Sequence, residues 1–230
     1  MSSSRPLPLI LVLLLGAGGV AAEPREWVSY RDAYRAMVVF EKYGKPKNLI
    51  QNHYQVMPKD RGVPAEGLQL ALNSKSLQLK LPLDATGRAV FPLLKAAYDE
   101  NAELVLNRKV SQLVLRPRVS IVVRPDGVYE AAELQAACEQ ALNYQRFVDA
   151  SAHAKKCVGV RFAFAGKGEQ PGVKLRRGDV EQALPVLPGA AFADDPNQAF
   201  LTVTYRFVQP AAREQVVTRD APLAIAALFE

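Results

Sequence analysis

The clearest pattern along the chain is an alternation from Leu77 to Leu83, in which leucine fills every second position. A period of two is typical of a β-strand with one buried face. The sequence Asp84-Ala85-Thr86-Gly87-Arg88 follows and has the composition of a tight turn. Because Ala89-Val90-Phe91 then resumes an apolar run, we predict that these two segments pair as a β-hairpin.

The residues before this pattern predict a helix of about twelve residues that starts near Tyr30. Ser29 and Asp32 have the spacing of a capping box, apolar residues repeat at helical spacing as far as Phe40, and Gly44 provides a stop. We also predict strands at 49–57, 67–72, 103–106 and 112–123 and one helical turn within 93–101. Pro117 interrupts the last strand and places it at an edge or a bulge.

The second part of the chain repeats the theme after a turn at Pro125-Asp126-Gly127. Helical spacing predicts a long helix over 128–150 that has Cys138 on its buried stripe. Strands are predicted at 159–165, 173–176, 200–208 and 214–218, and residues 224–229 are expected to form a strand or a short helix. The sequence thus predicts an α+β fold of mainly antiparallel β-sandwich modules, each preceded by an amphipathic helix.

We expect three parts: a signal peptide at 1–22, an N-terminal module at 23–125 and a C-terminal module at 126–230. The two modules show the same order of elements, which suggests an internal duplication. The segments from Pro92 to Asn101 and from Pro188 to Asn197 have equal length and similar composition. Coincidence between two proline-rich turns is the alternative.

The first residues have the three parts of a secretory signal peptide. Arg5 supplies the positive charge, an apolar run extends from Leu7 to Leu15, and small residues lead to Ala22. The run is shorter than the roughly 20 residues that span a bilayer. We therefore expect cleavage near Ala22, a periplasmic or secreted protein and no stable membrane insertion afterwards; a retained anchor helix is the alternative.

The chain contains two cysteines, Cys138 and Cys157. In an oxidising compartment such a pair favours a disulfide, which would close a loop of roughly 20 residues and add ~3 kcal/mol of stability. Two buried thiols are the alternative reading. A formal net charge of +6 is spread along the chain, so we expect no nucleic-acid partner.

Candidate catalytic chemistry is sparse. His53 and His153 are the two histidines, and neither lies near a Gly-x-Ser-x-Gly elbow, which the sequence lacks. We expect no catalytic, cofactor or metal residue, because two histidines and two bonded cysteines do not supply a zinc site. The acidic clusters Asp99-Glu100-Asn101 and Asp194-Asp195 with Asn197 are explained by turns more simply than by calcium.

Residues 30–123 carry a loose resemblance to a known group of proteins. The matching sequences are Tyr34-Arg35-Ala36-Met37, Leu81-Pro82-Leu83-Asp84 with Gly87, and Asn101-Ala102-Glu103-Leu104. Through them the segment resembles uncharacterised exported proteins of proteobacteria. This resemblance implies a location in the cell envelope and no particular activity.

The favoured function is a non-enzymatic one, in which the protein binds a protein or another component of the cell envelope, for example through an exposed strand edge. One alternative is a hydrolase of envelope glycans or peptides that uses an unrecognised carboxylate site. Another alternative is a carrier of a small apolar ligand, which predicts a sealed apolar cavity between helix and sheet.

Overall fold

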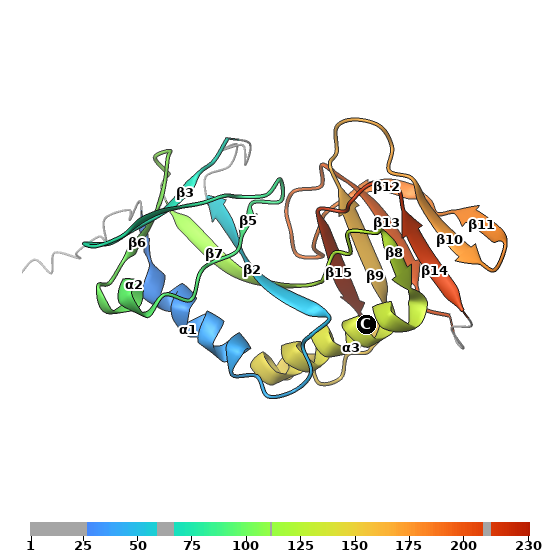
Figure 1. Ribbon diagram of the computed structural model, residues 1–230, viewed down its shortest axis with the longest axis horizontal. Helices are drawn as coiled ribbons and strands as arrows, with labels where there is room; N and C mark the ends of the chain where they lie inside the picture. Colours follow the sequence, from blue (N-terminus) through green and yellow to red (C-terminus); the bar gives the residue numbers. More distant parts are fainter. Residues whose placement is uncertain (1–26, 59–66, 111, 209–212) are drawn as a thin grey trace, which may run out of the picture.

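The computed structural model describes residues 27–58, 67–110, 112–208 and 213–230, so the predicted signal peptide lies outside the described residues. The described chain is mostly antiparallel β-sheet with few helices, as the sequence predicts. Figure 1 shows two halves side by side, with the longest helix running along one side of both. We call residues 27–125 the N-terminal half and residues 126–230 the C-terminal half.

The N-terminal half contains two sheets, with strand orders β1-β6-β3-β4 and β5-β2-β7. The strands are β1 (Trp27–Ser29), β2 (Ile50–Pro58), β3 (Leu70–Asn73), β4 (Gln78–Leu81), β5 (Arg88–Ala89), β6 (Glu103–Leu106) and β7 (Leu113–Ile121). The helices are α1 (Tyr30–Glu41) and α2 (Lys95–Asp99).

The C-terminal half also contains two sheets, with strand orders β11-β10-β14-β8 and β12-β13-β9-β15. Its strands are β8 (Val128–Glu130), β9 (Cys157–Phe164), β10 (Val173–Arg177), β11 (Val180–Ala183), β12 (Val186–Gly189), β13 (Phe200–Arg206), β14 (Glu214–Thr218) and β15 (Ala224–Phe229). Its helices are α3 (Ala131–Val148) and the short 3₁₀ helix η1 (Ala150–Ala152).

The helix predicted at Tyr30 is confirmed, and its start has half of the predicted cap. The Ser29 hydroxyl accepts a hydrogen bond from the backbone N–H of Arg31 at 3.3 Å. Asp32 does not complete a capping box; its carboxylate pairs with Arg35 at 3.1 Å. A neighbouring cation on the same helix face is therefore its partner.

The predicted hairpin between residues 77–83 and 89–91 is wrong. Strand β4 pairs with β3, and β5 pairs with β2 in the other sheet. The turn itself forms, since the Asp84 carboxylate accepts the backbone N–H groups of Thr86 at 2.8 Å and Arg88 at 2.9 Å. The alternation correctly marks one buried face, but it does not reveal which neighbouring strand forms the ladder.

The structure resolves two open points of the sequence and adds four strands. Residues 224–229 form a strand, and the strand with Pro117 is the outer strand of its sheet, as the proline predicts. Sequence reasoning missed β1, β11 and β12, and it wrongly placed the residues of β8 in the helix predicted at 128–150, which begins at Ala131. These strands have three or four residues each, and every residue of β11 is exposed, so they carry little alternation.

Each half has a core that unites both of its sheets with its helix. In the N-terminal half, Tyr30 of α1 packs in one cluster with Leu72 and Leu104 of one sheet and Tyr54 of the other. The second half repeats this arrangement around α3. A smaller cluster connects the halves, in which the rings of Tyr43 and Tyr144 meet edge to face with centroids 5.2 Å apart.

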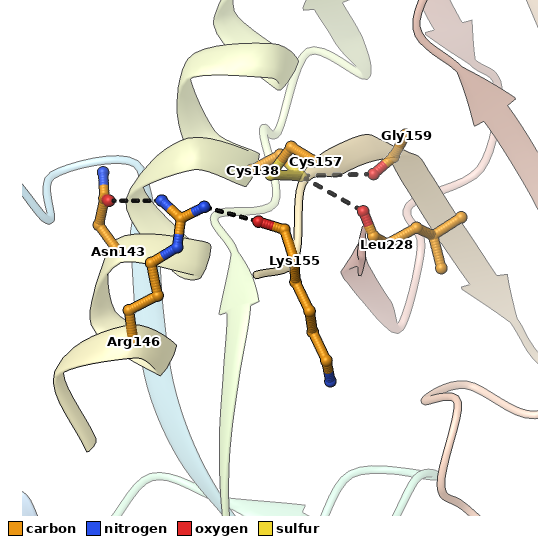
Figure 2. The surroundings of a disulfide bond; sticks show 7 residues. All are labelled: Cys138, Asn143, Arg146, Lys155, Cys157, Gly159 and Leu228. Atoms are coloured by element: carbon orange, nitrogen blue, oxygen red, sulfur yellow. Dashed lines mark hydrogen bonds between the residues drawn. A yellow bond between two sulfur atoms is a disulfide. The ribbon is translucent and has the colours of Figure 1, made fainter. Parts of the chain in front are cut away.

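The predicted disulfide between Cys138 and Cys157 is present and connects α3 to the start of β9 (Figure 2). The two Cα atoms are 6.0 Å apart. The Cys138 sulfur is buried, 3.6 Å from the carbonyl oxygen of Gly159. Arg146 of α3 also donates to the backbone carbonyl of Lys155 at 2.6 Å. Residues 155–157 are therefore connected to α3 both by this hydrogen bond and by the disulfide.

We expect the double variant Cys138→Ala with Cys157→Ala to lose about 3 kcal/mol of stability, because the unfolded chain gains the freedom of an open loop. Urea unfolding of the oxidised protein and of the variant measures this difference. Wild-type protein kept in a reductant serves as the control and is expected to match the variant. Equal urea midpoints for oxidised and variant protein would contradict the prediction.

Candidate functional site

The two halves meet at the outer strands of two sheets. Strands β7 and β15 lie next to each other, although they do not form a ladder. Helix α3 contacts β2 and β7 in the N-terminal half and β9 and β15 in its own half, as its course in Figure 1 indicates. The loop at 190–199, between β12 and β13, completes the junction from the C-terminal half.

A buried polar network joins this loop to the N-terminal half. The Gln55 side chain of β2 is 2% exposed, and its amide donates to the Asp195 carboxylate at 2.8 Å. The side-chain oxygen Oε1 of Gln55 accepts a hydrogen bond from Nε of Arg118 at 2.7 Å. Arg118 Nη1 in turn donates to the Asp194 carboxylate at 2.6 Å. Side chains from the two halves are thus hydrogen-bonded to each other.

A second arginine crosses the same junction. Arg88 is 3% exposed, and its guanidinium is held by Asp84 at 2.9 Å and by the Ser120 hydroxyl at 3.3 Å. It also donates to the backbone carbonyl of Leu223 in the C-terminal half. The ring of Phe192 lies near both guanidinium groups, with its centroid 5.3 Å from Cζ of Arg88 and 4.9 Å from that of Arg118.

An open cleft of about 510 Å³ lies beside this network. Its walls come from β7, α3, β15, the loop at 190–199 and Lys155. Two arginines of β7, Arg116 and Arg118, converge there on one carboxylate, because Arg116 Nη1 lies 3.4 Å from Oδ2 of Asp194 while Arg118 contacts Oδ1. The cleft lining therefore carries three cations and one carboxylate.

The arginines control the charge of Asp194. Partial burial raises the pKa of its carboxyl group, but the hydrogen bond and charge of Arg118, with help from Arg116, outweigh burial and lower the pKa below its usual value. Asp194 is thus an anion at neutral pH. A carboxylate in this state serves as a hydrogen-bond acceptor and is a poor proton donor.

Arg118 retains donors that no described residue uses. Its Nη2 atom is buried and has no hydrogen-bond partner among the described residues, although Nε and Nη1 are both engaged. A guanidinium group offers five N–H donors in a fixed plane. A buried charged donor without an acceptor is unfavourable, so the hydrogen bonding of Arg118 is incomplete within the described residues.

The two histidines do not form a catalytic arrangement with the cleft residues. His53 lies on β2, where burial and the charge of Arg88 lower its pKa and Asp84 opposes them. It is therefore neutral at pH 7. His153 is exposed and directly follows η1. A thiol-based catalytic pair of His153 with Cys157 would need a free thiol, but Cys157 is in the disulfide.

The two acidic clusters singled out in the sequence act within the fold. Lys95 pairs with Asp99 at 2.5 Å, and the Ser76 hydroxyl donates to Glu100 at 2.6 Å. Asp195 accepts the backbone N–H of Asn197 at 3.4 Å in addition to Gln55. Within the parts of the chain that the structure describes, no group of three histidine, cysteine or acidic residues is arranged to hold a metal ion.

Sequence reasoning missed Gln55, Arg88, Arg118 and Phe192. Their signal is faint: Arg118 lies on a strand whose other buried residues are Leu113, Ser120 and Ile121, and Arg88 precedes buried Ala89 on a strand of two residues. A cation at an inward strand position indicates a buried ion pair or a ligand contact. The sequence contains the Arg116-Pro117-Arg118 interruption, but it does not show that residues 194–195 face it.

Comparison with models of known protein families, with curated proteins and with solved structures finds no match for this chain. None of the helices in the described ranges has the length and apolar character that a membrane crossing requires.

We expect Gln55→Leu to lower stability by about 3 kcal/mol, because it leaves the buried Arg118 Nε and the Asp195 carboxylate without their shared partner. Chemical unfolding measures the loss. Gln78→Leu, at an exposed position of β4, is the matched control and should change stability by less than about 0.5 kcal/mol. Equal effects of the two substitutions would show that the network contributes little.

Proposed function

We propose that this protein is an exported, non-enzymatic binding protein of the bacterial cell envelope, and that its ligand or partner occupies the cleft between the two halves. The observation that carries this proposal is the convergence of Arg116 and Arg118 on one side of an open cleft. Clefts at the junction of two structural units are common binding sites. The buried network holds Arg118 in place before any ligand arrives.

The two alternative functions receive less support from the geometry. A glycoside hydrolase of the usual kind needs two carboxyl groups, one of which stays protonated near neutral pH, whereas the lining of this cleft contains one, Asp194, with a lowered pKa. A carrier of a small apolar ligand predicts a sealed cavity. The cleft is open to solvent and carries charged groups.

The open edge of β11 is a second candidate surface for a protein partner. Strand β11 pairs with β10 on one side, and no described strand pairs with its other side. Val180 is 67% exposed on it, and Leu187 of the following strand is 62% exposed. Such an edge can accept an added strand from a partner.

We also propose that the two halves are β-sandwich modules, residues 23–125 and 126–230, that arose by duplication. Two strand orders support this: β1-β6-β3-β4 corresponds to β8-β14-β10-β11, and β5-β2-β7 corresponds to β13-β9-β15. The order along the chain is the same in both sets. The segment at 92–101 precedes β6, whereas the segment at 188–197 precedes β13, and these two strands do not correspond to each other. The equal length of the two segments therefore does not support the duplication.

Helices α1 and α3 add independent support for duplication, since each of the two directly follows a strand of three residues. Four buried positions recur at identical spacing: Tyr30, Ala33, Met37 and Phe40 in α1, and Ala131, Leu134, Cys138 and Ala141 in α3. The same spacing equates Tyr43 with Tyr144, whose rings contact each other. An experimentally determined structure in which the equivalent strands of the halves fail to superpose would contradict this proposal.

Export is tested by the intact mass of the protein isolated from the periplasm or the medium. We expect the mass of residues 23–230 less two protons, because the signal peptide is removed and the disulfide forms. Alkylation should add two groups only after reduction. Uncleaved protein with two free thiols would contradict both the location and the cleavage site.

Binding is tested by a photo-crosslinking amino acid placed at single positions of the exported protein in whole cells. We expect an adduct from Gln145, which lines the cleft, and none from Asp32, an exposed position on α1. Val180 on β11 provides the comparison with the second surface. An adduct from Val180 alone would move the partner to the strand edge, and adducts from none of the positions would contradict both surfaces.

A further inference from the structure

We propose that the cleft binds an amphipathic carboxylate, which is a molecule with a carboxylate group and an attached apolar chain. This inference rests on the proposed function and adds the chemical class of the ligand. The geometry of a carboxylate that the protein itself places beside the two arginines of the cleft carries the inference.

The Asp194 side chain shows that Arg116 and Arg118 together can bind one carboxylate group. Its two oxygens face two different guanidinium groups, Oδ1 at 2.6 Å from Arg118 Nη1 and Oδ2 at 3.4 Å from Arg116 Nη1. The two arginines are therefore separated by the width of one carboxylate. Arginine recognises carboxylates through such paired N–H donors.

The carboxylate of Asp194 leaves much of this capacity unused. It accepts one hydrogen bond from each arginine, while each guanidinium offers five N–H donors. Arg118 Nη2 has no partner among the described residues, and Lys155 adds a third positive charge to the lining. A second anion would be attracted by the remaining positive charge of the cleft.

Arg118 is also fixed in advance. Gln55 holds its Nε at 2.7 Å, and the Phe192 ring lies 4.9 Å from its Cζ. Its side chain is 10% exposed. A ligand that binds such a group does not have to order a long flexible side chain, so the entropy cost of binding is reduced.

The remaining lining favours an apolar chain next to the anionic group. Five apolar residues line the cleft as well: Val119 of β7, Ala141 of α3, and Ala226, Ala227 and Phe229 of β15. Each methylene group that leaves water against such residues contributes about 0.8 kcal/mol. A free inorganic anion would use only the charged groups, whereas an acyl chain also uses the apolar lining.

The test uses the full exported protein with octanoate as the probe, and calorimetric titration measures the dissociation constant. We expect octanoate to bind about tenfold more weakly to Arg116→Met, which removes one charged donor from the carboxylate. Arg124→Met is the matched control, since Arg124 has the same exposed fraction, 41%, and makes its ion pairs with Asp126 and Glu133 away from the cleft. Asp194→Asn removes the competing anion and should tighten octanoate binding.

Acetate, octanol and octylammonium separate the parts of the proposal. Acetate carries the charge without the chain, octanol has a neutral head and octylammonium has the opposite charge, so all three should bind more weakly than octanoate. Equal binding of octanoate and acetate would overturn the apolar contribution. Equal binding of octanoate and octylammonium, or equal effects of Arg116→Met and Arg124→Met, would overturn the anion site.

The crosslinking experiment distinguishes failure of this inference from failure of the proposed function. If octanoate does not bind but Gln145 still forms an adduct in cells, the cleft is a binding site for another class of ligand and the carboxylate proposal is wrong. If neither octanoate binding nor an adduct at Gln145 is observed, the proposed function is wrong as well.

Discussion

The junction between the halves depends on two buried arginines. Removing a guanidinium group from water costs several kcal/mol unless hydrogen bonds and opposite charge replace the water. Arg88 obtains these partners from Asp84 in its own half and from the Leu223 carbonyl in the other. Arg118 obtains them from Gln55 and from Asp194. Because each arginine takes partners from both halves, a shift of one half against the other would break hydrogen bonds at both buried groups, so the network favours one relative position of the halves.

Apolar contacts reinforce this polar junction at a different place. The cluster around Phe40, Tyr43 and Tyr144 joins the end of α1 to α3, and the disulfide attaches α3 to β9. The polar network and the aromatic cluster thus hold the halves at two separate points, and the cleft is bordered by α3, β7 and β15. Its walls belong to elements that these contacts already order, so a ligand would meet a largely formed site.

Sequence reasoning predicted the local elements well where periodicity was long. The helix at Tyr30 and the strand at 214–218 have the predicted bounds, and the disulfide follows from two cysteines and the predicted compartment. The pairing of β4 with β3 could not be predicted, because alternation defines a buried face and leaves the choice of neighbour to the rest of the fold. The candidate site was hidden for a related reason: Arg118 and Asp194 are 76 positions apart, and no local pattern connects them.

If the halves arose by duplication, the location of the cleft follows from the geometry of the repeat. Equivalent outer strands, β7 and β15, then lie next to each other, and Tyr43 meets its equivalent Tyr144. A junction of two identical surfaces would bring like groups together, so arginines on both sides would repel each other. The difference between the halves removes this problem: β7 contributes Arg116 and Arg118, whereas β15 contributes Ala226 and Ala227 at the cleft. If so, divergence of the repeats gives the cleft both charged and apolar lining residues, which an amphipathic anion requires.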